Sequence, residues 1–345
     1  MRTLRIITVV QVVFAVLVVG FAFAQSPGEK IVVINEETAV KSGQQIVDTV
    51  YLGDILYAGE TKGPWIRVES WGGWVLKSSV IPLDQAVEYF TKAIERDPNN
   101  AYLYAARAHV WGRSFNEEES GLGETGKAIA DFTRAIQLNP SNAHFHFCRA
   151  MNYQFENALA KAIEGYTKTI RLVPEWINAF KNRALCWIEL GEFDKALEDL
   201  NEALKLDPKD AKLWIIRGVA HSNRGEYEKA ISNFSEGIRL APEDPYGLAE
   251  LAWLYATCSD ASFHNGPKAV ELATKACELS QWEDAWNLNS LAAAYARIGN
   301  FEQAIQWEQK AVDLDPDFGP YQERLALYET GTPFEEAPPT PTNLR

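Results

Sequence analysis

Apolar and polar residues follow a helical period over most of the chain from Asp84 onward. Amphipathic runs of this kind end at short boundaries whose second residue is proline. These boundaries are Asp97-Pro98, Asn139-Pro140, Val173-Pro174, Asp207-Pro208, Ala241-Pro242 and Asp315-Pro316. Their prolines are 42, 34, 34, 34 and 74 residues apart, and the missing boundary falls at Ser280-Gln281. The pattern predicts a regular succession of helix pairs.

Small residues keep fixed places relative to these boundaries. Alanine stands twelve residues before the second residue of each boundary, at Ala86, Ala128, Ala162, Ala196, Ala230, Ala269 and Ala304. A second column of small residues stands ten residues after the second residue of each boundary, at Ala108, Ala150, Ala184, Gly218 and Ala252. Its last member, Ala292, comes one place later because Trp282 is inserted. Small side chains at these places let the two helices of a pair approach closely.

The spacing and the alanine columns resemble tetratricopeptide repeats over residues 84–330. The resemblance implies an all-α solenoid of six repeats that start near residues 101, 143, 177, 211, 245 and 285. A leading half repeat at 84–97 and a capping helix at 318–330 are expected to close its ends. The proline-rich tail, 331–345, is expected to be flexible.

Residues 28–83 carry a different pattern, in which short β-forming runs are separated by Gly, Asn and Lys. The runs lie at 30–34, 47–52, 55–58, 65–70 and 73–76. The stretch GPWIRVESWGGWVLKSSVIPL resembles the end of a bacterial SH3-like domain, through Trp65, Val68, Gly73, Trp74, Val75 and Val80. This resemblance implies a small all-β barrel.

The amino terminus, residues 1–24, has the layout of a secretory signal peptide. Arg2 and Arg5 precede an uncharged apolar run, and Ala22-Phe23-Ala24 forms a small-x-small cleavage site. The alternative is an uncleaved membrane anchor, because the run from Ile6 to Ala24 is barely long enough to span a bilayer. The body is therefore expected in the periplasm or secreted. The order of segments is similar to exported bacterial proteins that join an SH3-like module to tetratricopeptide repeats.

Charge and cysteine spacing exclude several classes of protein. The chain has 33 basic and 47 acidic residues, a net charge of −14, which disfavours nucleic acid and anionic membrane surfaces as partners. The four cysteines form no CxxC motif, so a zinc finger or a disulfide-dense scaffold is excluded. We expect buried free thiols.

Two motifs imitate ligand sites. Residues 121–127, GLGETGK, approach a phosphate-binding loop, but a helix precedes them and Ala128 replaces the hydroxyl that would hold magnesium. No nucleotide is therefore expected. His144 and Cys148 share a helical face and could hold a metal, yet the sequence offers no evident third ligand, so we expect a core role for them and no metal site. HExxH and GxSxG motifs are absent, and no catalytic residue or cofactor is predicted.

A third pattern concerns arginine. Arg107, Arg149, Arg183 and Arg217 stand nine residues after their boundaries, and Asp131, Asp199 and Asn233 stand nine before the next. We expect a ladder that ties first to second helices within repeats. The alternative is a cationic ligand site.

Peptide-binding residues are expected along the first helices, which face the concave side of such an array. The candidates are Tyr102, His144, Phe147, Lys181, Lys212, Tyr246, Trp253 and Trp286. In the SH3-like module the candidate groove residues are Tyr57, Trp65, Trp71 and Trp74. The competing interpretation is that Trp65 and Trp74 fill the barrel, and that several first-helix residues pack only on one another.

The residues support two functional hypotheses. The first is a non-enzymatic adaptor of the bacterial envelope that binds a protein or peptide in the concave groove. The alternative is a noncatalytic subunit that targets the cell wall, with the SH3-like module as the site for peptidoglycan or peptide.

Overall fold

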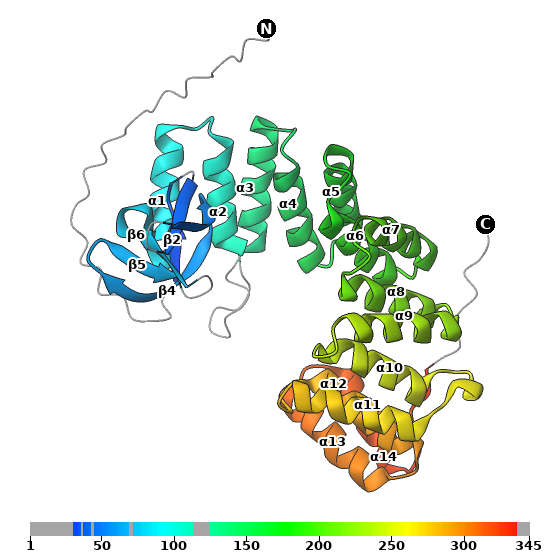
Figure 1. The fold of residues 1–345 in the computed structure, drawn as a ribbon. Helices are drawn as coiled ribbons and strands as arrows, with labels where there is room; N and C mark the ends of the chain where they lie inside the picture. The colour runs from blue at the N-terminus through cyan, green and yellow to red at the C-terminus, as the bar shows by residue number, and fades with distance from the viewer. Residues whose placement is uncertain (1–29, 36, 43–44, 69–71, 113–123, 337–345) are drawn as a thin grey trace. The chain divides into compact units, whose positions relative to one another are not determined.

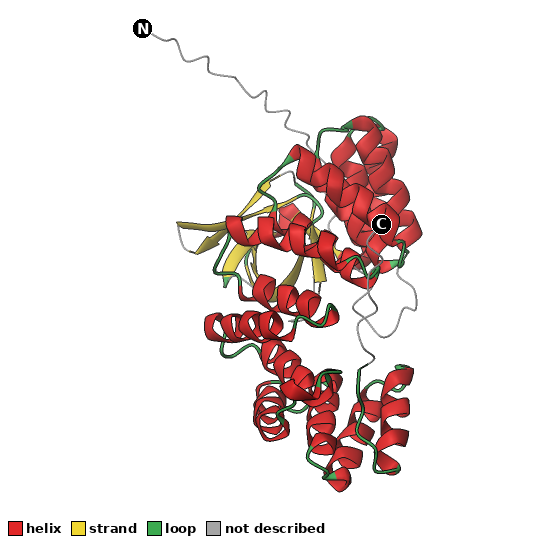
Figure 2. Cartoon of the chain, turned by 90° about the vertical axis from the view of Figure 1, so that its right-hand side faces the viewer, coloured by secondary structure: helices red, strands yellow, loops and turns green. Residues whose placement is uncertain are grey.

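The structure is a computed structural model that describes residues 30–35, 37–42, 45–68, 72–112 and 124–336. The predicted signal segment and the last nine residues of the chain lie outside the described residues. The chain divides into two compact units, Met1–Pro98 and Asn99–Arg345. Described strands occur only in the first unit, and helices build the second (Figure 1, Figure 2).

The first unit contains one antiparallel sheet of seven strands. They are β1 Lys30–Val33, β2 Glu37–Ser42, β3 Gln45–Tyr51, β4 Ile55–Lys62, β5 Trp65–Val68, β6 Gly73–Leu76 and β7 Val80–Pro82. The strand order is β3-β2-β6-β5-β4-β1-β7. Alternate residues such as Ile31, Val33, Ile66 and Val68 point into a common core and are fully buried, as the period of a strand requires.

Strands β2 and β7 were not predicted from the sequence pattern. The pattern of β2 is weak because its sequence, ETAVKS, places one large apolar residue among polar ones, although Val40 is fully buried. β7 is three residues long and ends in Pro82, at the edge of the sheet beside β1. A proline is tolerated there because no further strand requires its N–H. The SH3-like identity of this sheet stays a prediction.

Helix α1, Leu83–Arg96, follows β7 directly and belongs to the first unit. Its buried residues, Ala86, Phe90 and Ile94, recur at the helical period of one face. The helix contacts β1 and β7. The division between the units therefore lies after α1, whereas the helical pattern of the sequence begins at Asp84.

Six helix pairs follow. Their first helices are α2 Ala101–Gly112, α4 Ala143–Phe155, α6 Ile177–Glu189, α8 Ala211–Asn223, α10 Pro245–Thr257 and α12 Ala285–Arg297. Their second helices are α3 Thr125–Leu138, α5 Leu159–Leu172, α7 Phe193–Leu206, α9 Tyr227–Leu240, α11 Gly266–Leu279 and α13 Phe301–Leu314. Helix α14, Gly319–Glu329, closes the array. The predicted repeat starts and closing helix are confirmed.

Local chemistry explains where these helices begin. The side chains of Asn142, Asp210 and Asp244 accept backbone N–H groups at the start of α4, α8 and α10, which satisfies donors that the helix leaves unpaired. Between first and second helices the turn needs a left-handed residue. Gly191 has φ +74° at this place, and Asn157 occupies it with φ 55° in the second repeat.

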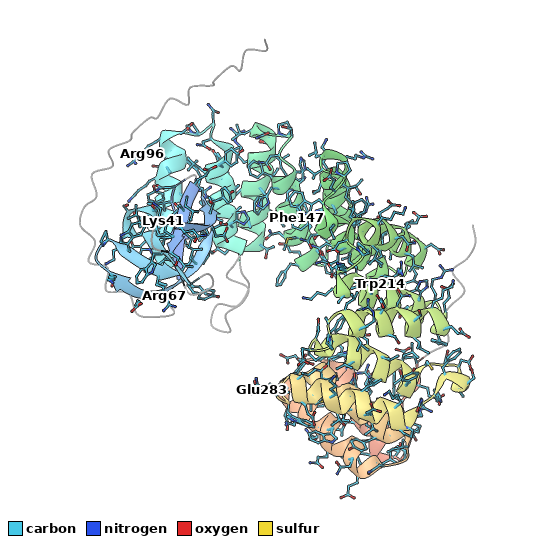
Figure 3. The ribbon with its side chains drawn as sticks, in the orientation of Figure 1. Lys41, Arg67, Arg96, Phe147, Trp214 and Glu283 are labelled. Carbon is cyan, nitrogen blue, oxygen red and sulfur yellow. The ribbon has the colours of Figure 1, made fainter. Side chains whose placement is uncertain are left out.

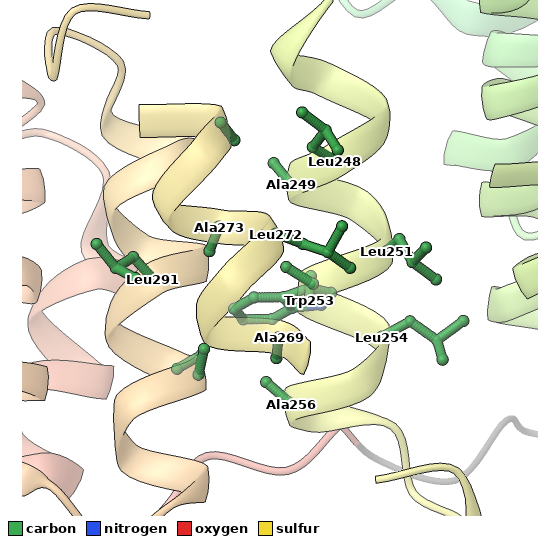
Figure 4. Packing of buried hydrophobic residues seen from close by; sticks show 14 of the residues in the cluster. Leu248, Ala249, Leu251, Trp253, Leu254, Ala256, Ala269, Leu272, Ala273 and Leu291 are labelled. Atoms are coloured by element: carbon green, nitrogen blue, oxygen red, sulfur yellow. The ribbon is translucent and has the colours of Figure 1, made fainter. Parts of the chain in front are cut away.

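The alanine columns form the contact between the helices of each pair. All seven second-helix alanines, from Ala86 to Ala304, are fully buried, and so are the alanines of the first-helix column from Ala108 to Ala292. Gly218, which replaces alanine in that column, is buried too. Figure 4 shows this packing for α10 and α11, where Ala269 and Leu272 face α10. The four cysteines are free and buried within the array, as expected.

Residues 113–123 lie outside the described residues, and the connection between α10 and α11 contains the short helix η3, Ala261–Phe263. A search of the described helices for one with the length and hydropathy to cross a bilayer finds none.

Candidate functional site

The first helices form a continuous layer, because α4, α6, α8, α10 and α12 contact one another in succession. Helix α2 joins this layer where the ring of Tyr102 lies 5.5 Å from that of Phe145 on α4. All eight candidate groove residues lie on this layer. Tyr102 is on α2, His144 and Phe147 on α4, Lys181 on α6, Lys212 on α8, Tyr246 and Trp253 on α10, and Trp286 on α12. Figure 3 shows the side chains along the array, with Phe147 labelled. The structure gathers these residues into two clusters separated by the two lysines.

The C-terminal cluster centres on Trp253 and Trp286, whose rings lie 5.0 Å apart. A segment of the chain itself, Thr332–Glu336, lies against Trp253, and we call this segment the strap. The indole Nε1 of Trp253 donates a 2.6 Å hydrogen bond to Oε1 of Glu336. The ring of Phe334 lies 5.6 Å from that of Trp253, and the backbone N–H of Glu336 donates to the carbonyl of Thr257. The first residues of the tail therefore pack on the array, where the sequence predicted flexibility.

Two arginines complete this cluster. The guanidinium of Arg324, on α14, lies 4.9 Å from the ring centres of both Trp253 and Phe334. Arg297, on α12, donates to Oε1 of Glu335 at 3.1 Å and to the carbonyl oxygen of Phe334 at 3.2 Å. The strap is thus held through its aromatic ring, its carboxylates and its backbone. Neither arginine was predicted as a site residue. Arg324 lies on α14, outside the first helices, and Arg297 lies in the last turn of α12, beyond the positions considered for the groove.

Electrostatics make this surface suited to an acidic segment. Burial, together with the charge of Glu336, raises the pKa of Glu250, on α10, to about 8, against the opposing hydrogen bonds of Trp286 and Tyr246. Glu250 is therefore mostly protonated at neutral pH and repels an incoming carboxylate little. Burial also raises the pKa of Glu336, against the opposing effects of Trp253 and Arg324. The remaining charges near the strap include the two arginines, which attract carboxylates.

The N-terminal cluster combines aromatic rings with metal-ligating residues. Trp176 stacks on Phe147 with ring centres 5.0 Å apart and on His144 at 6.1 Å. His109, on α2, brings its Nε2 to 3.3 Å from Nε2 of His144. Together with Cys148 these histidines place three potential ligand atoms within 4.8 Å of one another. The structure thus supplies the third ligand that the sequence did not reveal.

Between the clusters lie Lys181, which is half-buried on α6, and Lys212, which is exposed in the first turn of α8. Lys212 also donates its backbone N–H to the capping carboxylate of Asp210. Their positive charges suit an acidic segment that passes along the first helices.

The predicted arginine ladder is present. Arg107 pairs with Asp131, Arg183 with Asp199, and Arg217 donates to Asn233. A surface pocket of ≈760 Å³ opens beside Arg183 and Arg217, but Asp199 holds Arg183 in an ion pair and the side-chain amides of Asn233 and Asn201 hold Arg217. This ladder therefore supports the repeats rather than a cationic ligand site.

The candidate residues of the first unit separate into two places. Trp65 and Trp74 line a pocket of ≈230 Å³ together with Lys41 and Lys62, and neither ring belongs to the buried core. Tyr57 lies under Lys30, whose Nζ is 5.7 Å from the ring centre. Trp71 is outside the described residues.

The phosphate-loop motif has no matching geometry in its described part. Lys127 lies in the first turn of α3, pairs with Glu124 and sits 4.4 Å from the ring centre of Trp111. The preceding described element is helix α2, not a strand. Residues 121–123 lie outside the described residues.

Comparison with known proteins identifies the repeats. The tetratricopeptide repeat family matches residues 177–210, 200–232, and 83–100 together with 287–318. A comparison with curated proteins finds no match. These matches identify tetratricopeptide repeats from α6 to the start of α9 and in α12 with α13, and they include the segment that forms α1.

Several solved structures share the fold. A tetratricopeptide repeat protein from Parabacteroides merdae ATCC 43184 aligns with a TM-score of 0.60 at 20% identity, over 72% of this chain and 92% of that one. The Cut9-Hcn1 hetero-tetramer of APC/C gives a TM-score of 0.57 at 17% identity. That alignment covers 71% of this chain but 46% of the other. PilW, a type IV pilus biogenesis factor, gives 0.53 at 17% identity, over 65% and 97%.

Proposed function

Because this chain carries tetratricopeptide repeats, we propose that it is a non-enzymatic scaffold whose first helices bind an extended peptide segment of a partner protein. The observation that carries the proposal is the strap. An extended piece of chain already lies against Trp253, held through a ring, two carboxylates and a backbone carbonyl. The fold it shares with a subunit of the Cut9-Hcn1 hetero-tetramer supports a role in assembly.

The strap also indicates the chemistry of the partner segment. Its sequence, Thr-Pro-Phe-Glu-Glu, gives one aromatic anchor followed by two acidic residues. The anchor meets Trp253, which is 7% exposed, and such buried aromatic contacts dominate the energy of peptide interfaces. The acidic residues meet Arg297 and the Trp253 indole N–H. We therefore propose that the groove selects an aromatic residue followed by acidic ones, with Lys181 and Lys212 extending the cationic path.

A peptide in trans tests this proposal. The receptor is the full chain with Phe334→Ala and Glu336→Ala, which removes the two side chains of the strap that contact Trp253. The probe is a fluorescent peptide with the sequence of residues 330–336, and the measurement is fluorescence anisotropy. We expect the probe to bind this variant at least tenfold more tightly than the unmodified chain, in which the strap competes.

A matched pair of tryptophan variants identifies the site. We call the chain with Phe334→Ala and Glu336→Ala the strap variant. Adding Trp253→Ala to it is expected to weaken binding of the probe by roughly 30-fold, which corresponds to about 2 kcal/mol. Adding Trp214→Ala is the control, because Trp214 lies on first helix α8 and donates its indole N–H to the carbonyl of Pro208. Equal affinities in the two variants, or no binding to the strap variant, would contradict the proposal.

We propose that the scaffold acts outside the cytoplasm, on the strength of the signal-like sequence at residues 1–24. The pocket formed by Trp65, Trp74, Lys41 and Lys62 favours the second candidate function, cell-wall targeting. Sedimentation with purified peptidoglycan tests it. Loss of sedimentation in Trp74→Ala, with the peptide affinity unchanged, would assign wall binding to the first unit.

A further inference from the structure

Three metal-ligating side chains meet at the surface between α2 and α4. His144 and Cys148 are four residues apart and therefore project from one face of α4. His109 reaches them from α2, the first helix of the preceding repeat. Nε2 of His144 lies 3.3 Å from Nε2 of His109 and 3.3 Å from Sγ of Cys148, and all three atoms fall within 4.8 Å.

These separations match those of ligands around one small ion. With Zn–N bonds of roughly 2.0–2.1 Å and a Zn–S bond of roughly 2.3 Å, tetrahedral angles put two nitrogens about 3.3 Å apart and a nitrogen and a sulfur about 3.6 Å apart. The two 3.3 Å separations are close to these values. The third separation, between His109 and Cys148, lies within 4.8 Å, and rotation of these side chains would have to bring it to about 3.6 Å around an ion.

The surroundings hold the ligands in place and leave the site accessible. Trp176 stacks on His144 at an interplanar angle of 17°, and Phe132 meets His109 edge-on with ring centres 5.2 Å apart. All three ligands stand on helices, which position side chains more accurately than loops. His144 is exposed while Cys148 is 7% exposed, so an ion can enter from the groove and reach a thiol that is shielded from solvent.

We propose that His109, His144 and Cys148 bind a zinc ion, with a water molecule as the fourth ligand. Two imidazoles and a thiolate are a donor set that zinc favours over the hard cations magnesium and calcium. The thiol has to lose its proton when the ion binds. An ion in this place joins two consecutive repeats through their first helices and so stabilises their contact.

Cobalt substitution tests the donor set. The purified full chain is first treated with a chelator and then titrated with Co²⁺, whose thiolate charge-transfer and tetrahedral ligand-field absorption reports sulfur coordination. We expect both features to appear with one equivalent of Co²⁺ and to disappear when Zn²⁺ displaces it. Absence of the thiolate band would overturn the proposal.

Matched variants test the three residues. His109→Ala, His144→Ala and Cys148→Ala are each expected to lower Zn²⁺ affinity by roughly 100-fold, since losing an outer-shell partner alone costs about 10–100-fold. The controls are His264→Ala and Cys277→Ala, which remove a histidine and a buried cysteine elsewhere in the array. Zinc affinity that survives the three site variants, or falls equally in the controls, would overturn the proposal.

Thermal unfolding with and without zinc detects binding even in a variant that is less stable than the unmodified chain. Zinc is expected to raise the Tm of the unmodified chain and of both controls, because it binds only the folded state. It should leave the Tm of each site variant unchanged, whatever that value is. If His144→Ala or Cys148→Ala does not fold, His144→Gln or Cys148→Ser respectively takes its place in both measurements. A zinc-dependent rise in these variants would show that the ion binds elsewhere.

Discussion

Arg183 holds Asp199 in a two-pronged ion pair, with Nε donating at 2.8 Å and Nη2 at 2.6 Å to the two carboxylate oxygens. The third nitrogen, Nη1, donates to the hydroxyl of Thr167 on the second helix of the preceding repeat. Arg217 repeats this arrangement with Asn233 and Asn201. Arg183 and Arg217 therefore each join their repeat to the one before it as well as binding the two helices of their own repeat.

Breaking this pair should destabilise the array. Both side chains are mostly buried, at 17% and 7% exposure, so Asp199→Ala leaves an uncompensated buried cation. We expect a loss of about 3 kcal/mol in the free energy of unfolding, measured by urea denaturation. Lys205→Ala is the control, because its pair with Glu202 is exposed and should change stability by less than about 1 kcal/mol. Equal effects would mean that the pair has no structural role.

Two helical glycines should respond in opposite directions to alanine. A Cβ at Gly218 would lie 2.6 Å from the ring of Phe234, which is itself 1% exposed and cannot move aside. Gly218→Ala is therefore expected to cost about 1–3 kcal/mol. Gly126→Ala places its Cβ in open space and should raise stability by up to about 1 kcal/mol. Thermal unfolding of both variants measures the difference, and a neutral Gly218→Ala would contradict the close helix contact.

The closing helices should lose stability as pH rises. Glu308, on α13, is fully buried, and within the described residues neither carboxylate oxygen has a hydrogen-bond partner. Burial raises its pKa to about 8, although Arg324 opposes the shift. The folded state therefore keeps a proton that the unfolded chain releases near pH 4.5. The stabilisation is complete below that pH and is lost as pH rises to about 8.

Glu308→Gln removes this dependence by keeping the side chain neutral. We expect it to raise the Tm at pH 8 by roughly 2–8 °C and to change the Tm little at pH 5. Glu302→Gln, an exposed position on the same helix, is the control. A Tm gain that is the same at both pH values would show that the charge of Glu308 is not its cause.

Lys127 should be dispensable for binding. It is occupied by Glu124 and by the ring of Trp111 at the start of α3. When Lys127→Ala is added to the chain that carries Phe334→Ala and Glu336→Ala, we expect the affinity for the residue 330–336 peptide to stay within about twofold and ATP hydrolysis to stay at the buffer background. Hydrolysis that depends on Lys127 would contradict a non-enzymatic scaffold.

The sequence was sufficient for the array because its contacts are local and periodic. Each boundary proline fixed a helix end, and each column alanine fixed a helix contact, so the starts of all six repeats followed directly. In the sheet, β2 was missed although it pairs with its sequence neighbour β3. Its single large apolar residue, Val40, is recognisable as a core residue only beside the strands that cover it.

The groove was only partly predictable. Trp253 stands eleven residues after its boundary and contacts Trp286 near the start of the next repeat, and His109 and His144 occupy the corresponding places. The equivalence of these positions can be seen in the sequence, and it would have predicted that His109 lies beside His144. The strap was not predictable, because proline-rich composition predicts flexibility, and nothing in the sequence relates Glu336 to a residue 83 positions earlier.

The strap also sets the conditions under which a partner can enter. Because it is covalently attached, it faces Trp253 at an effective concentration on the order of millimolar. The observed affinity of any partner is its intrinsic affinity multiplied by the fraction of molecules whose groove is open. Segments that only equal Phe334-Glu335-Glu336 in affinity are displaced at ordinary concentrations. Under the function proposed above, the strap therefore favours partner segments that make further contacts along the first helices, toward Lys212 and Lys181.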